Sequence, residues 1–239
     1  MEAEPIPPIE SDGRGRVARP QRIVVMVSGS GSNLQAVLDA CNAGSLDGEV
    51  VAVISNKPEV FALQRADAAG VPAVHVGLNP GEDRGAYDAR LADVVAGFAP
   101  DVVVLAGWMR LLTMSFLGWF PDRVINLHPA LPGELPGTHA IERAWAEASA
   151  GTRRQTGVMI HLVPDAGVDD GPVLGSATID IDTTTTYEEF EASVHGVEHR
   201  LLVETLIRLC NQSPTELASL YQSDSTSDRA HSDRKEVSA

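Results

Sequence analysis

Short apolar runs alternate along the chain with stretches in which apolar residues recur every three or four positions. The runs, several of them rich in β-branched residues, occupy residues 23–27, 50–55, 73–76, 101–106, 124–128, 157–163 and 173–182. Such runs predict β-strands, and those without apolar–polar alternation are typical of strands covered on both faces. The helically spaced stretches occupy residues 34–41, 60–69, 83–98, 115–120, 141–150 and a final segment that opens near residue 186. This alternation predicts a Rossmann-like α/β fold, a doubly wound, mostly parallel sheet with helices on both faces.

The two ends of the chain lack this periodicity. Residues 1–21 are rich in Pro, Gly, Arg and Glu, which predicts a flexible N-terminal extension. Residues 211–239 are rich in Ser, Asp and Thr, which predicts a tail that is largely disordered, above all after about residue 222. We therefore expect one domain, at residues 22–210.

Composition and charge narrow the class of function. The sequence has no apolar run approaching the roughly 18 residues of a membrane span, and no apolar signal segment near its N-terminus. A net charge of −15 disfavours nucleic acids and anionic membranes as partners, because phosphate backbones bind clustered Lys and Arg, but it permits a small anionic substrate. The two cysteines, Cys41 and Cys210, form no disulfide framework or metal-ligand set. These features indicate a cytoplasmic enzyme that acts on small molecules.

A Gly- and Ser-rich loop, residues 28–33, follows the first predicted strand and precedes the first predicted helix. A helix N-terminus offers backbone N–H groups and a positive dipole end to an anion. The loop has neither the GxGxxG pattern nor the Lys of a Walker A sequence, so a single phosphate monoester fits it better than a dinucleotide or a triphosphate. The alternative is that these residues only form a tight turn.

The strand predicted at residues 124–128 carries Asn126 and His128, which are two positions apart and therefore share a face. Pro129 ends the strand, and the Pro and Gly residues after it predict a shaped loop. Ligands of open parallel sheets bind at the carboxyl ends of the strands. The alternative is that both side chains only satisfy buried backbone groups.

The last predicted helix opens with two overlapping capping boxes, Thr185-x-x-Glu188 and Thr186-x-x-Glu189. Farther along it, His195 and Glu198 are three positions apart and share a face. They are either part of a site or a solvated surface pair.

Several motifs occur in a characteristic order: Ser28-Gly-Ser-Gly-Ser-Asn33, Gly107-x-Met-Arg-Leu, Asn126-x-His128-Pro129, Pro136-Gly137, His161 and Asp169-Asp-Gly-Pro-Val173. Together they resemble the phosphoribosylglycinamide formyltransferases of purine biosynthesis, over about residues 22–210. The combination of Asn-x-His-Pro with a downstream Asp-x-Gly is typical of the wider formyltransferase group. The Gly-rich loop indicates its glycinamide ribonucleotide branch.

The resemblance implies a formyltransferase fold and the transfer of a formyl group from 10-formyltetrahydrofolate, a co-substrate, to the amine of 5′-phosphoribosylglycinamide, without a metal. It implies that Asn126, His128 and Asp169 are catalytic, with the carboxylate favouring a protonated imidazole. The substrate-binding residues that it implies are Gly31, Ser32 and Asn33 for the 5′-phosphate, and Glu198 for the ribose hydroxyls. The folate-binding residues that it implies are Arg84, Leu105, Met109, Arg110, Leu111, Leu112 and Val163, with the loop at 164–169. A homodimer is compatible with the sequence, which does not determine the assembly.

Four segments depart from the family pattern: the loop after Pro129, the stretch before Asp169, a helix near residues 146–150 that is about one turn longer, and the end after residue 210. Three other functions stand as alternatives. One residue is inserted before Asp169, so Asp165 and Asp170 compete with it for the catalytic role, although the Asp-x-Gly-Pro match favours Asp169. The loop after Pro129 reads Ala-Leu-Pro-Gly-Glu, where Ser/Ala-Leu-Leu-Pro is usual. Formyltetrahydrofolate hydrolase and methionyl-tRNA formyltransferase are rivals that would carry an extra N-terminal or a basic C-terminal domain. A phosphosugar- or nucleotide-binding sensor without catalysis is the rival outside enzymes.

Overall fold

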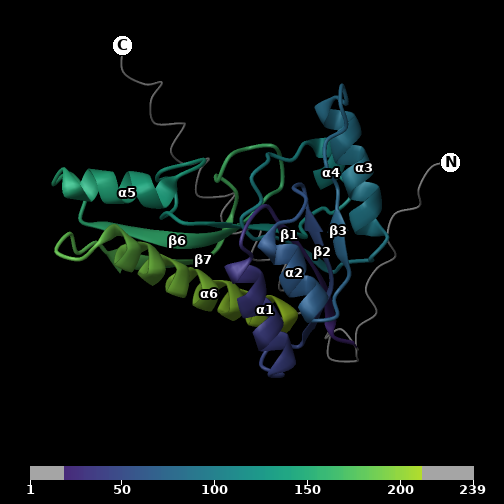
Figure 1. Cartoon of the computed structure of the whole chain (residues 1–239), viewed down its shortest axis with the longest axis horizontal. Coiled ribbons are helices and arrows are strands. Elements are labelled where there is room, and N and C mark those ends of the chain that lie inside the picture. Colours follow the sequence, from purple (N-terminus) through teal and green to yellow (C-terminus); the bar gives the residue numbers. More distant parts are fainter. Residues whose placement is uncertain (1–18, 212–239) are drawn as a thin grey trace, which may run out of the picture.

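The computed structural model describes residues 19–211, so the predictions for residues 1–18 and 212–239 lie outside the described residues. One seven-stranded sheet crosses the domain, with helices packed on it (Figure 1). The strands are β1 (Gln21–Val27), β2 (Gly48–Ser55), β3 (Ala73–His75), β4 (Val102–Leu105), β5 (Val124–His128), β6 (Gln155–Leu162) and β7 (Val173–Asp180). The helices are α1 (Ser32–Asn42), α2 (Phe61–Ala68), α3 (Arg84–Ala96), α4 (Met114–Leu117), α5 (Ala140–Ser149) and α6 (Tyr187–Asn211).

The strand order is β3-β2-β1-β4-β5-β6-β7. Strands β1 to β5 are parallel, whereas β6 pairs antiparallel with β5, and β7 pairs antiparallel with β6. The predicted fold class, a mostly parallel doubly wound sheet, is confirmed. The chain runs outward from β1 to β3 and then returns to β4 on the other side of β1. The carboxyl ends of β1 and β4 therefore flank a topological switch point, where ligands of such sheets bind.

Two apolar cores lie on the two faces of the sheet. Helices α1, α2 and α6 cover one face with residues such as Leu34, Ala62 and Leu206. Helices α3 and α4 cover the other with Leu91 and Phe116, and Figure 1 shows the two groups of helices apart from each other. Alternate residues of β1 belong to the two cores, as strand geometry requires. The central strands are thus buried on both faces, which explains their nearly continuous apolar runs.

A third, smaller core lies under α5. It contains Ala130 and Leu135 from the loop after β5, with Ala140 and Ala144 from the helix. This packing fixes the loop beside the end of β5, although its sequence departs from the family pattern.

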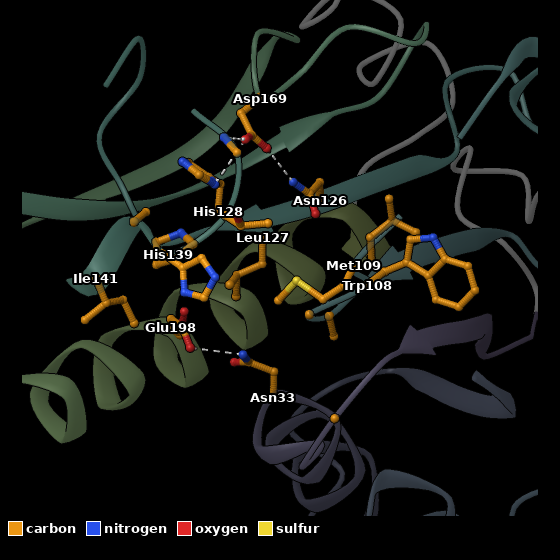
Figure 2. A pocket seen from close by; sticks show the side chains of 18 of the residues that line it. Asn33, Trp108, Met109, Asn126, Leu127, His128, His139, Ile141, Asp169 and Glu198 are labelled. Carbon is orange, nitrogen blue, oxygen red and sulfur yellow. Dashed lines mark hydrogen bonds and ion pairs between the residues drawn. The ribbon is translucent and has the colours of Figure 1, made fainter. Parts of the chain in front are cut away.

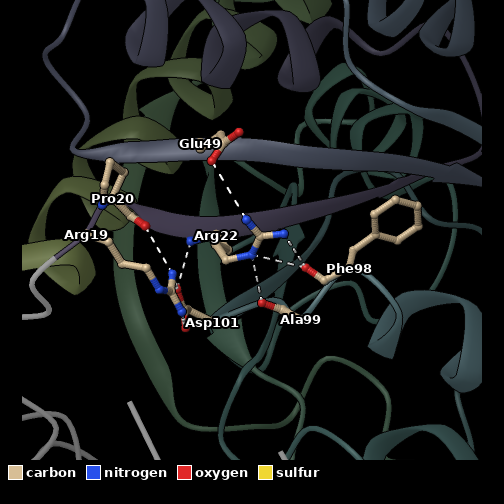
Figure 3. Close-up of polar contacts among 7 residues, drawn as sticks. All are labelled: Arg19, Pro20, Arg22, Glu49, Phe98, Ala99 and Asp101. Atoms are coloured by element: carbon tan, nitrogen blue, oxygen red, sulfur yellow. Dashed lines mark hydrogen bonds and ion pairs between the residues drawn. The ribbon is translucent and has the colours of Figure 1, made fainter. Parts of the chain in front are cut away.

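A cluster of charged residues closes the amino edge of the sheet (Figure 3). Two guanidinium nitrogens of Arg19 donate to the carboxylate of Asp101, at 2.6 and 3.1 Å. The backbone N–H of Arg22 donates to the same carboxylate at 2.8 Å. The Arg22 guanidinium donates to the carbonyls of Phe98 and Ala99. The cluster joins the start of β1 to the turn before β4, and it also holds Arg19, within the predicted extension.

Local chemistry determines two helix boundaries. Helix α6 begins with one of the two predicted capping boxes: Glu189 accepts from the Thr186 amide at 3.0 Å, and Thr186 Oγ1 accepts from the Glu189 amide at 3.2 Å. Helix α4 ends at Leu117, before the predicted residue 120, with Gly118 as its C-cap. The apolar spacing at 115–120 reflects burial of Phe116 and Phe120 rather than a longer helix.

Candidate active site

A cavity of about 740 Å³ opens at the carboxyl ends of β1, β4 and β5. The loop after β1 and helix α6 line one end of it, and the Gly107–Leu112 segment after β4 lines the other. The end of β5 and the loop after β6 lie between them. The cavity therefore occupies the switch point of the sheet.

Strand β5 presents Asn126 and His128 to this cavity, as the period-two argument predicts (Figure 2). The Nδ2 amide group of Asn126 donates to Asp169 Oδ1 at 3.0 Å. It also lies 3.1 Å from Nε2 of His161, the residue directly opposite it on β6. The structure thus brings Asn126 and His128 of β5 together with Asp169 of the loop after β6.

His128 is almost fully buried and faces two acceptors. Its Nε2–H donates to the carbonyl oxygen of Leu135 at 3.0 Å, and its Nδ1 lies 3.3 Å from Asp169 Oδ2. A neutral imidazole carries one proton and can serve only one of these acceptors, whereas an imidazolium serves both. The surroundings of His128 therefore suit a group that gains and loses a proton.

Asp169 is held by backbone geometry as well as by its partners. Its φ of 54° is in the left-handed region, and the Gly137 amide donates to Oδ2 at 2.8 Å. Gly171 approaches the Leu162 carbonyl so closely that a Cβ atom would lie 2.0 Å from that oxygen. The Asp-x-Gly-Pro motif thus shapes the turn that directs the Asp169 carboxylate toward β5.

The neighbouring carboxylates have other partners. Asp165 accepts from the Gly167 amide at 2.8 Å, and the carboxylate of Asp170 lies against Gly167. Geometry therefore favours Asp169 among the three acidic candidates, in spite of the inserted residue.

Burial and charge shift the two central pKa values. Burial lowers the pKa of His128 below its ordinary value, and Asp169 and the Leu135 carbonyl only partly oppose this. The expected effect of Asp169 is present, but desolvation outweighs it, so burial favours the neutral form of His128 more than in a free histidine. Burial by itself raises the pKa of Asp169, but contacts with His161, the Gly137 amide and His128 together bring that pKa below its usual value.

The Gly-rich loop at the other side of the cavity is tightly constrained. Gly31 has a φ of 74°, and a Cβ atom there would lie 2.6 Å from the Cβ of Ala62 on α2. Only glycine fits both constraints. Ser32 begins α1, so the amide groups of this first turn face the cavity that Gly31, Ser32 and Asn33 line. Arg65 of α2 donates to the Ser30 carbonyl at 2.9 Å, a contact that no motif in the sequence indicates.

A buried carboxylate connects this loop to α6. Glu198 Oε2 accepts from Asn33 Nδ2 at 3.1 Å and from His195 Nδ1 at 2.8 Å. The hydrogen bond to Glu198 raises the pKa of His195. The Glu198 side chain is 4% exposed and the His195 side chain is 41% exposed, so the carboxylate of this pair is buried although its imidazole partner reaches solvent.

The opposite end of the cavity is mainly apolar. The side chains that line it are those of Leu105, Met109, Leu111, Leu112 and Val163. Leu105 and Leu112 are buried, whereas Met109 and Leu111 are exposed. Arg110 also lines it, with its guanidinium carbon 4.9 Å from the centre of the Tyr87 ring. Arg84 does not line this cavity and instead lies 3.7 Å from Asp88 within α3.

No group of three or more His, Cys, Asp or Glu side chains that could hold a metal ion occurs within residues 19–211. Over the same residues, no helix is both long enough and apolar enough to cross a membrane.

Comparison with known proteins supports the resemblance drawn from the motifs. The formyl transferase family matches residues 21–206. The chain belongs to this family. It is 41% identical to the phosphoribosylglycinamide formyltransferase of Schizosaccharomyces pombe, over 77% of this chain and 94% of that protein. It is 37% identical to the Escherichia coli protein of the same name, over 75% of this chain and 82% of that one.

Solved structures of the family share the fold. Glycinamide ribonucleotide transformylase 1 from Symbiobacterium toebii superposes with a TM-score of 0.74 at 37% identity, covering 80% of this chain and 87% of that one. The phosphoribosylglycinamide formyltransferase of Bacillus halodurans gives a TM-score of 0.75 at 33% identity, covering 82% and 98%. The family resemblance and the fold class predicted from the sequence are both confirmed.

Proposed function

We propose that this formyl transferase family member transfers the formyl group of 10-formyltetrahydrofolate to the amine of 5′-phosphoribosylglycinamide, in de novo purine biosynthesis. One observation carries the proposal. Asn126, His128 and Asp169 converge between a Gly-rich helix N-terminus and an apolar slot, in a single cavity. The relatives bear the name of this activity.

The two ends of the cavity suit the two substrates of the reaction. The amide groups at the start of α1, with Gly31, Ser32 and Asn33, suit a phosphate. Glu198, on the facing helix, suits the ribose hydroxyls as an acceptor. The pterin would lie in the mainly apolar end of the cavity. We assign folate binding there to Leu105, Met109, Arg110, Leu111, Leu112 and Val163. Arg84, at the start of α3, stays a prediction for the outer part of the folate.

The central residues suit the transfer itself. The amine nitrogen attacks the formyl carbon, and negative charge develops on the formyl oxygen. In this structure one N–H of the Asn126 amide donates to Asp169 Oδ1. During transfer the same N–H would donate to the formyl oxygen instead, as an oxyanion donor. His128, neutral at the start, takes the proton that leaves the amine and delivers it to N10 of the folate as the C–N10 bond breaks. Asp169 stabilises the imidazolium in between.

The direct test is to mix purified protein with both substrates and to follow the absorbance of the deformylated folate. We expect turnover that depends on both compounds. Formate release from 10-formyltetrahydrofolate alone would instead indicate a hydrolase. Binding of both ligands without turnover would indicate a sensor and contradict the proposal. Cytoplasmic location and a homodimer stay predictions, which fractionation and light scattering would test.

A further inference from the structure

His161 is a buried histidine for which the proposed chemistry has no role. It lies on β6, directly opposite Asn126 on β5, and is 2% exposed. Its ring contacts the Asn126 amide at one nitrogen and the backbone at the other. A buried imidazole this close to the reacting groups calls for an account of its protonation and orientation.

The backbone determines which nitrogen of His161 carries the proton. Nδ1 lies 2.7 Å from the carbonyl oxygen of Leu162, which can only accept, so Nδ1 bears the hydrogen. In the neutral ring Nε2 then offers a lone pair. Nε2 is 3.6 Å from Asp169 Oδ1, too far for a hydrogen bond, but 3.1 Å from the side-chain nitrogen of Asn126. Nε2 therefore accepts from Asn126.

This acceptor determines which way the Asn126 amide points. The nitrogen and oxygen of an Asn side chain are nearly the same size, so hydrogen bonding alone decides between its two orientations. In this structure one N–H goes to His161 and the other goes to Asp169. During transfer, the formyl oxygen takes the second N–H, and Asp169 can no longer select the orientation.

We propose that His161 is a positioning residue that keeps the Asn126 amide nitrogen directed at the formyl oxygen throughout the reaction. The inference rests on the proposed function, because it assumes that Asn126 is the oxyanion donor. Without the lone pair of His161, the Asn126 side-chain amide is rotated by about 180° in a fraction of molecules. In that orientation it presents its oxygen to the developing negative charge. That orientation repels the transition state and leaves ground-state binding almost untouched.

Two variants separate positioning from packing. His161→Leu removes the acceptor, and His161→Gln supplies a carbonyl oxygen in nearly the same place. We expect His161→Leu to lower kcat by about 100-fold, the typical cost of an oxyanion donor, with KM for both substrates nearly unchanged. We expect His161→Gln to recover most of that loss. Val158→Ala, on the opposite face of β6, is the control for a destabilised strand and should keep the wild-type kcat.

The spectroscopic readout does not depend on activity. In ¹⁵N-labelled protein, the side-chain amide protons of Asn126, assigned by their loss in Asn126→Ala, should exchange slowly with solvent in the wild type and in His161→Gln. They should exchange much faster in His161→Leu. If the wild type transfers no formyl group, the proposed function fails, while these exchange rates still test the positioning. Unchanged exchange in His161→Leu, or a kcat close to wild type, or no recovery in His161→Gln, would each overturn the inference.

Discussion

A buried carboxylate and a partly buried one, at opposite edges of the same sheet, illustrate two uses of an aspartate. Asp101, at the amino edge, accepts from the Arg19 guanidinium and the Arg22 amide (Figure 3). Asp169, at the carboxyl edge, accepts from the Asn126 side chain and the Gly137 amide and lies beside His128 (Figure 2). A guanidinium stays charged at all accessible pH values, so Asp101 has permanent partners. The partners of Asp169 can turn away or titrate.

This is the difference expected between an acid that stabilises the fold and one that takes part in the proposed reaction. Asp101 is fixed by a permanent charge and joins two strands, so its loss should weaken the fold. The Asp169 carboxylate is satisfied by groups that a substrate can recruit. Substitutions at the two edges should therefore divide cleanly between activity and stability.

The largest effects should come from the partners of Asp169. We expect Asn126→Ala to lower kcat by about 10² to 10³, because an oxyanion donor is lost, and His128→Ala to lower it by about 10² to 10⁴, because proton transfer is lost. Both proteins should stay folded by circular dichroism and should bind ribose 5-phosphate normally. His75→Ala, on an exposed edge strand, is the matched control for removal of an imidazole. Near-normal turnover in either site variant would remove its assigned role.

The next largest effect should distinguish the three acidic residues near the insertion. Asp169→Asn should lower kcat by on the order of 10²-fold, because the imidazolium of His128 loses its counter-charge. Asp165→Asn and Asp170→Asn make the same chemical change on the same loop and should stay close to wild type. The reverse order, measured in the same assay, would move the catalytic assignment to one of the neighbours.

At the amino edge the effect should appear in stability alone. Asp101→Asn should lower the free energy of unfolding by about 2 kcal/mol, because a buried hydrogen-bond network loses its negative charge and one of its two acceptor oxygens. Its kcat should equal that of the wild type. The Glu49 side chain is 64% exposed, and its carboxylate lies 3.9 Å from the Arg22 guanidinium. Glu49→Gln should therefore change neither the free energy of unfolding nor kcat. Urea titrations of the three proteins make the measurement, and a kcat defect in Asp101→Asn would erase the contrast between the two edges.

The sequence predicts the features that depend on short-range periodicity. The two-residue spacing of Asn126 and His128 placed both on one face of a strand. The three-residue spacing of His195 and Glu198 placed both on one face of a helix. The Asp-x-Gly-Pro match to the family pattern favoured Asp169, and the structure adds that Gly171 approaches the Leu162 carbonyl closely. The two spacing inferences need only local geometry.

The remaining features depend on contacts between distant segments. The pairing of Asn126 with His161 follows from the register of β5 against β6, which no local pattern encodes. The Leu135 carbonyl and the Gly137 amide are backbone groups, so residue types do not reveal them. Arg65 reaches the Gly-rich loop from α2, 35 positions after Ser30. Burial of His128 lowers its pKa, although the sequence suggested the opposite balance.

The smallest predicted effect concerns the Glu198 carboxylate, which connects α6 to the Gly-rich loop. The Glu198 hydrogen bond raises the folded-state pKa of His195, so the folded state binds the proton more tightly than the unfolded state. The resulting stabilisation is fully present below the unfolded pKa of about 6.5 and is lost as pH rises through the folded pKa. His195→Gln should therefore lower the free energy of unfolding by less than about 1 kcal/mol near pH 6, with a smaller difference at pH 9. Urea titrations at several pH values test this, with His75→Gln as the control. A difference that grows with pH would show that His195 is not held protonated by Glu198.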